Sequence, residues 1–148
     1  MPASADRNRS AARRITFELF AAGKLSLMDE LTTPGFVNHG QTPGVPEAEG
    51  RASLANAIER VRAAFPDFRY DLVHEVADGD LVVHHLAAHG TQRGPFAGAA
   101  PTGRTAVWRE VHVMRFEEGR MAEQWGVVDR LSALQQLGLA PAPPGAKR

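Results

Sequence analysis

The stretch FRYDLVHEVADGDLVVHHLAAHGT, residues 68–91, decides the class of fold. Apolar and polar side chains alternate from Phe68 to Val76, and a period of two is typical of a strand with one buried face. Asp78-Gly79 is a strong signal for a tight hairpin turn, because glycine readily adopts the positive φ that such turns need. Residues 81–91 are therefore predicted to form a second strand, antiparallel to the first.

The C-terminal part of the chain continues with a second hairpin and a closing helix. In chain order, the predicted elements are a Gly/Pro-rich loop at 93–104, a strand at 105–116, a turn at Glu118-Gly119, a strand at 121–128 and a helix at 131–137. Residues 140–148 are Pro-rich and basic, and we expect them to form a flexible tail.

Helices are predicted before the strands, because apolar residues recur there at spacings of three and four. The first predicted helix includes residues 15–22 and ends at Gly23. Two more are predicted at residues 26–31 and 53–65, and the last of them ends before Pro66. Helices followed by antiparallel strands predict an α+β fold. We expect one domain over residues 1–148 with a core at about 10–139, in which a curved antiparallel sheet packs on the N-terminal helices and encloses a pocket.

The composition excludes several classes of function. The chain has 148 residues, and its 17 basic and 17 acidic residues cancel. A neutral balance favours neither a nucleic-acid partner nor a membrane partner. The chain has no cysteine and no apolar run near the ~20 residues of a membrane span. We therefore expect a soluble, cytoplasmic protein.

The histidines do not predict a metal site. His85 and His89 share one face of a predicted strand, with His84 on the other face. Four residues along a strand span about 13 Å, which is too far for two ligands of one ion. We expect no metal and interpret these side chains as rim or interface histidines.

Several short motifs in the C-terminal half form an ordered set. They are Gly90-Thr91-Gln92-Arg93-Gly94, Pro101-Thr102-Gly103-Arg104, the stretch from Met114 to Trp125, Asp129 and Gln135-Gln136-Leu137-Gly138. With the opening helices and Phe36-Val37-Asn38-His39, this set resembles the SnoaL-like polyketide cyclase or ester cyclase family of the nuclear transport factor 2 (NTF2)-like superfamily. The resemblance covers about residues 15–139.

The resemblance implies a cone-shaped α+β barrel that is dimeric or tetrameric, and a small hydrophobic polycyclic substrate. In the best understood branch, the enzyme closes a ring in an aromatic polyketide ester by an intramolecular aldol condensation without a cofactor. A base removes a proton from a carbon next to a carbonyl, and the enolate attacks a second carbonyl. Hydrogen-bond donors then stabilise the enolate oxygen.

The resemblance also implies where the site lies. The family's pocket asparagine matches Asn38, beside His39, and its polar-x-His pair matches Glu110 and His112. Because side chains alternate, the pair shares a strand face with Trp108 and Met114. We expect these two residues, His39 and Trp125 to line the substrate site, with Trp108 and Trp125 as core residues in the alternative interpretation. In many members an aspartate directly follows this tryptophan, but Gly126 occupies that position here. Asp129 matches a second family pattern, Trp followed four residues later by Asp.

Each of these residues also has a structural interpretation that remains open. Glu110 and His112 are candidate catalytic groups. Alternatively, His112 is a hydrogen-bonded histidine of the barrel wall, and Glu110 forms a salt bridge across the sheet. Asp129 is a third catalytic candidate, or the N-cap of the helix at 131–137. Asn38 orients the substrate, or fixes a turn beside Gly40.

Two classes of function remain open as well. The first is an enzyme of the lyase or isomerase type that performs cofactor-free acid/base chemistry, either aldol ring closure or a related isomerisation. The replacement of the usual aspartate by Gly126 also admits a divergent member that acts in polyketide hydroxylation. The second class is a non-catalytic module that binds a small ligand or a partner protein.

Overall fold

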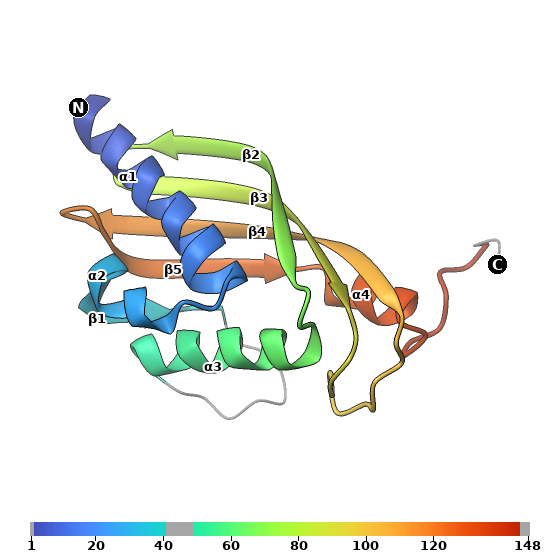
Figure 1. Ribbon diagram of the computed structural model, residues 1–148. Coiled ribbons are helices and arrows are strands. Elements are labelled where there is room, and N and C mark those ends of the chain that lie inside the picture. Colours follow the sequence, from blue (N-terminus) through green and yellow to red (C-terminus); the bar gives the residue numbers. More distant parts are fainter. Residues whose placement is uncertain (1, 41–48, 146–148) are drawn as a thin grey trace.

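The computed structural model describes residues 2–40 and 49–145 (Figure 1). The N-terminal elements are α1 (Pro2–Arg14), the π-helical segment η1 (Ile15–Ala21), the 3-10 turn η2 (Leu25–Leu27), α2 (Met28–Leu31) and β1 (Thr32–Asn38). The remaining elements are α3 (Gly50–Ala64), β2 (Arg69–Asp78), β3 (Leu81–Thr91), β4 (Thr105–Glu117), β5 (Arg120–Val128) and α4 (Arg130–Gln136). The predicted α+β class is confirmed.

Both predicted hairpins are present, and glycine makes their turns possible. Gly79 between β2 and β3 has a φ of 59°, and Gly119 between β4 and β5 has a φ of 80°. Residues with side chains rarely adopt this region, whereas glycine does so at little cost. The two hairpins pair along the contact between β3 and β4, where eleven cross-strand pairs run from Leu81↔Arg115 to Thr91↔Thr105.

The sheet has one strand more than predicted, and it is mixed, not purely antiparallel. Its order is β1-β5-β4-β3-β2, and β1 runs parallel to β5, with Thr32 opposite Met121 and Asn38 opposite Gln124. A parallel pair needs a long crossover, which α3 and the two hairpins supply here. Pro34 and Gly35 obscure the strand pattern of β1, and they are tolerated because β1 lies at the sheet edge.

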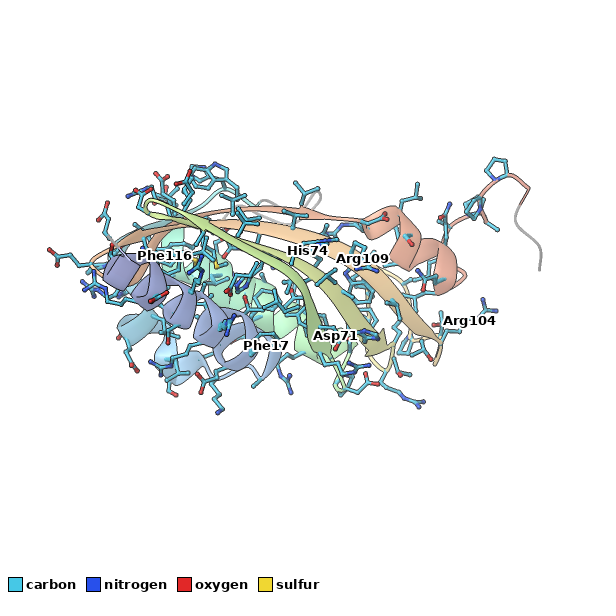
Figure 2. All side chains as sticks on the ribbon, turned by 90° about the horizontal axis from the view of Figure 1, so that it is seen from above. Phe17, Asp71, His74, Arg104, Arg109 and Phe116 are labelled. Atoms are coloured by element: carbon cyan, nitrogen blue, oxygen red, sulfur yellow. The ribbon has the colours of Figure 1, made fainter. Side chains whose placement is uncertain are left out.

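Helices α1 and α3 lie on one side of the curved sheet (Figure 1). Viewed from above, the strands arch over these helices, with Phe17 among the helices and His74 and Arg109 on the sheet (Figure 2). The inner face of the sheet is therefore covered by helices. None of the described helices is long and apolar enough to cross a membrane.

The buried apolar side chains form two clusters along the inner face. One cluster contains Leu19, Ile58, Val82, Met114 and Met121, and the other contains Phe65, Phe68, Leu86, Trp108 and Leu137. Along β3, Val82 belongs to the first cluster and Leu86 to the second, with the fully buried His84 between them. Polar side chains thus lie between two apolar regions of the core.

The outer face of the sheet exposes apolar side chains. Val111 on β4 is 36% exposed, and Val127 opposite it on β5 is 73% exposed. Such a face is compatible with the expected dimer or tetramer, which stays a prediction. Of the predicted tail at 140–148, the described residues up to Gly145 contain no helix or strand, and the last three residues lie outside the described range.

Candidate active site

One row of residues crosses four strands on the inner face. Glu75 on β2 pairs with His84 on β3, His84 pairs with His112 on β4, and His112 pairs with Gly126 on β5. We call these four residues the polar row. Because paired residues of neighbouring strands present their side chains on the same face, sequence-distant groups meet here.

Glu110 lies next to the polar row and accepts three hydrogen bonds. Its Oε1 accepts from the Tyr70 hydroxyl at 2.7 Å and from His112 Nε2 at 2.8 Å, and its Oε2 accepts from Trp108 Nε1 at 2.8 Å. Burial raises the pKa of the Glu110 carboxyl, but hydrogen bonds from His112, Tyr70 and Trp108 and the nearby imidazole outweigh it, so this pKa lies below its ordinary value. The carboxylate is therefore ionised and held by fixed donors.

The hydrogen bonds of His112 define its tautomer. The carboxylate of Glu110 only accepts, so Nε2 of His112 carries a hydrogen and donates it. In the neutral ring Nδ1 is then an acceptor, and Nε2 of Gln124 lies 3.0 Å from it and donates. The arrangement leaves His112 with a basic nitrogen on the side away from Glu110.

His112 is also the more accessible member of the pair. Its side chain is 13% exposed, whereas that of Glu110 is 6% exposed. On the Nδ1 side the neighbouring residue is Gly126, where an added Cβ would lie 3.1 Å from Nδ1 and 3.3 Å from Cε1 of His112. Gly126 thus adds no side chain over the basic nitrogen, whose neighbour on β5 is the Gln124 amide.

His84 forms a second imidazole–carboxylate pair, but here both ring nitrogens already have partners in the protein. Its Nδ1 contacts the Thr16 hydroxyl at 2.7 Å and its Nε2 contacts Glu75 at 2.8 Å. Burial lowers the pKa of His84, although Glu75 acts in the opposite direction. Glu75 is held in turn by two 2.9 Å bonds from Arg13. With no exposed surface, His84 has a structural role beside His112.

The two other inner-face candidates on β4 are mainly core residues. Trp108 is 5% exposed and belongs to the second apolar cluster, and its indole nitrogen fixes Glu110. Met114 is 1% exposed and belongs to the first cluster. Alternation along the strand placed both on the face of Glu110 and His112, as predicted.

The structure places His39 and Trp125 away from this face. Trp125 pairs with Val113, on the outer side of β5, and is 38% exposed. The His39 ring stacks on the indole, with ring centroids 4.8 Å apart and an interplanar angle of 8°. This stacked pair lies on the opposite side of the sheet from Glu110, so it does not join the other predicted site residues.

Asn38 is on the inner side but is used in local bonds. Its Oδ1 accepts from the Gly40 amide at 3.0 Å, and its Nδ2 donates to the Ser53 hydroxyl at 3.0 Å. The first bond fixes the turn that follows β1, and the second ties β1 to α3. These bonds match the structural interpretation of Asn38.

Asp129 lies at the end of β5 as the N-cap of α4. Its side chain accepts from the Ser132 amide at 3.1 Å, and the residue is exposed. Among the described residues, no hydrogen bond joins Asp129 to Glu110 or His112.

Asp129→Ala tests the two interpretations of this residue. Loss of the cap is expected to reduce the free energy of unfolding by about 1 kcal/mol, because one amide at the start of α4 loses its acceptor. We expect no change in turnover, since the carboxylate is not part of the Glu110–His112 cluster. Chemical unfolding and a kinetic assay measure the two effects. Lost turnover at unchanged stability would instead make Asp129 a catalytic group.

The described residues contain no group of three or more His, Asp or Glu side chains placed to hold a metal ion. His85 lies on the outer face, where its Nδ1 is 3.0 Å from Nδ1 of His74, and His89 contacts Asp71. A hollow of about 330 Å³ lies against β1, β4 and β5, lined by residues that include Thr33, Arg115 and Glu123. No predicted site residue lines it.

Sequence reasoning missed Tyr70 and Gln124 as members of this cluster. Alternation along β2 and β5 places both side chains on the inner face of the sheet. Their roles, however, depend on which residues lie opposite them on the neighbouring strands. That register appears only when β2, β4 and β5 pair. A polar residue at an inner position, as at Gln124, was the one signal available in the sequence.

Comparison with known proteins decides the family. The family model for SnoaL-like polyketide cyclases matches residues 10–137. The chain belongs to the SnoaL-like polyketide cyclase family. Nogalonic acid methyl ester cyclase of Streptomyces nogalater is 30% identical over 80% of this chain and 89% of its own length. Aklanonic acid methyl ester cyclase DnrD of Streptomyces peucetius is 26% identical over 82% of this chain and 84% of its own.

Solved structures agree with this assignment. IdmH of Streptomyces antibioticus, a proposed polyketide cyclase, superposes with a TM-score of 0.76 at 29% identity over 88% of this chain and 98% of its own. AclR of Streptomyces galilaeus, a proposed hydroxylase, has a TM-score of 0.81 at 24% identity over 95% of this chain and 87% of its own. The second likeness bears on the fold alone.

Proposed function

We propose that this SnoaL-like protein closes a ring in an aromatic polyketide methyl ester by cofactor-free acid/base catalysis. The observation that carries the proposal is the Glu110–His112 pair, in which an ionised, buried carboxylate orients an imidazole whose other nitrogen faces Gly126. The curated relatives named above act on methyl esters of this kind.

In the proposed reaction His112 is the base and Glu110 is a positioning residue. Nδ1 of His112 takes the proton from a carbon next to a carbonyl, and the electron pair of that C–H bond enters the enolate. The enolate carbon then forms a C–C bond to a second carbonyl carbon of the same molecule. The new alkoxide takes the proton back from Nδ1, so that substrate and product have the same composition.

In this proposal the carboxylate of the site lies at a different position from that in many family members. In many members an aspartate stands at the position of Gly126, and here that position has no side chain. Glu110 supplies the negative charge from the other side of the imidazole instead. A carboxylate behind an imidazole fixes the tautomer of the ring and stabilises the imidazolium that forms during proton transfer.

Aklanonic acid methyl ester and nogalonic acid methyl ester are suitable probes. We expect saturable ring closure, followed by chromatography, and faster exchange of the acidic proton in deuterated buffer than without protein, followed by NMR. Quenching of tryptophan fluorescence reports binding separately, because Trp108 adjoins Glu110. Binding without exchange or closure would favour the non-catalytic module, and a product heavier by one oxygen atom would indicate hydroxylation.

A further inference from the structure

Gln124 has a buried side-chain amide and no role in the reaction proposed above. It lies on β5 two residues before Gly126, and it is 7% exposed. Its side-chain nitrogen contacts Nδ1 of His112 at 3.0 Å, and within the described residues this is its one side-chain hydrogen bond. The amide therefore keeps a second donor hydrogen and its carbonyl oxygen for another partner.

The imidazole of His112 packs closely over Gly126. A Cβ there would lie 3.1 Å from Nδ1 of His112 and 3.9 Å from Nε2 of Gln124. Any side chain at position 126 would therefore crowd the basic nitrogen and lie close to the amide donor. Because Gly126 has none, this residue does not block a ketone or ester that approaches Nδ1, and a carbonyl oxygen two bonds from the reacting carbon would then lie near the amide.

We propose that Gln124 is a catalytic residue that donates a hydrogen bond to the enolate oxygen while Nδ1 of His112 removes the proton over Gly126. The inference rests on the proposed function and names the group that stabilises its intermediate. In the free protein the amide donates to Nδ1. When the substrate enters, the same N–H turns to the carbonyl oxygen and Nδ1 becomes free to accept the proton, so the amide keeps a partner throughout.

The charge changes support this role. As the C–H bond breaks, negative charge develops on the carbonyl oxygen, and a neutral amide donor stabilises it without supplying a proton. Donors fixed in a buried site are effective because they need little reorganisation during the reaction. Gln124 lies in the middle of β5, where it pairs with Met114 on β4 and with Asn38 on β1.

Gln124→Met tests the proposal, because methionine has similar volume and no N–H donor. We expect kcat for ring closure of aklanonic acid methyl ester to fall by about 10²–10³-fold at the pH of maximal activity, with little change in KM. Gln124→Glu, which keeps the shape but replaces the donor by an acceptor, is expected to lose at least as much. A thermal melt of each variant shows whether it is folded.

A purely structural role predicts a different result. If Gln124 only holds the imidazole, its loss should change the ¹⁵N signals of His112, whereas we expect the Nε2–H tautomer to persist because Glu110 fixes it. Gly126→Ala should also reduce turnover, because its methyl group would lie 3.1 Å from Nδ1 of His112, and Gly35→Ala is the matched control, since a Cβ there meets no atom within 4 Å.

The outcomes separate this inference from the proposed function. If the wild type neither exchanges the acidic proton nor closes the ring, both are overturned. If the wild type is active and His112 is required, but Gln124→Met retains its kcat, only the role of Gln124 is overturned. A folded, binding-competent Gln124→Met with strongly reduced kcat and an unchanged His112 tautomer supports it.

Discussion

His112→Gln is expected to reduce kcat for ring closure by a factor on the order of 10³. Glutamine can still occupy the space and bond to Glu110, but its amide is not basic and cannot take a proton from carbon. Exchange of the acidic proton into deuterated buffer should fall by a similar factor, because it depends on the same step. Binding of the methyl ester, measured by fluorescence, should change much less.

His85→Gln is the matched control for this substitution. His85 lies on the outer face of β3, one residue after His84, and it contacts His74 and not the polar row. The same chemical change there should leave kcat and KM unaltered. Equal losses in both variants would mean that the effect arises from general destabilisation, and an active His112→Gln would remove His112 as the base.

The fold was largely predictable because its strands carry strong local signals. Alternation from Phe68 to Val76 and the Asp-Gly and Glu-Gly turns locate both hairpins without tertiary information. The direction of β1 was not predictable in this way. No turn joins β1 to β5, so their parallel pairing depends on how α2 and α3 place the edge strand on the finished sheet.

The candidate site was predictable only in part. Alternation along one strand correctly grouped Trp108, Glu110, His112 and Met114 on one face. The bonds from Tyr70 and Gln124 depend on the register between strands, which a single sequence does not specify. Alternation along β5 places Trp125 on the other face, because it pairs with Val113 and its indole points outward.

Glu110→Leu is expected to have the largest effect on stability, a loss of about 3–5 kcal/mol in the free energy of unfolding. Leucine is similar in size but leaves three buried donors, from Tyr70, Trp108 and His112, without an acceptor. Each such donor is costly because it has given up water for a partner that is now missing. Glu117→Leu, at an exposed carboxylate of the same strand, should change stability by less than about 0.5 kcal/mol.

The pH dependence of this stabilisation has a definite sign. Because the pKa of Glu110 is lower in the folded than in the unfolded protein, its ionised form stabilises the fold. The contribution is complete above the unfolded value, about 4.3, and is lost as the pH falls through the lower folded value. Chemical unfolding of the wild type and Glu110→Leu between pH 7 and pH 3 should therefore show a stability gap that narrows toward acid. A gap that is constant or widens would mean that the Glu110 carboxyl is protonated in the native protein. Glu110 would then carry no negative charge with which to orient His112.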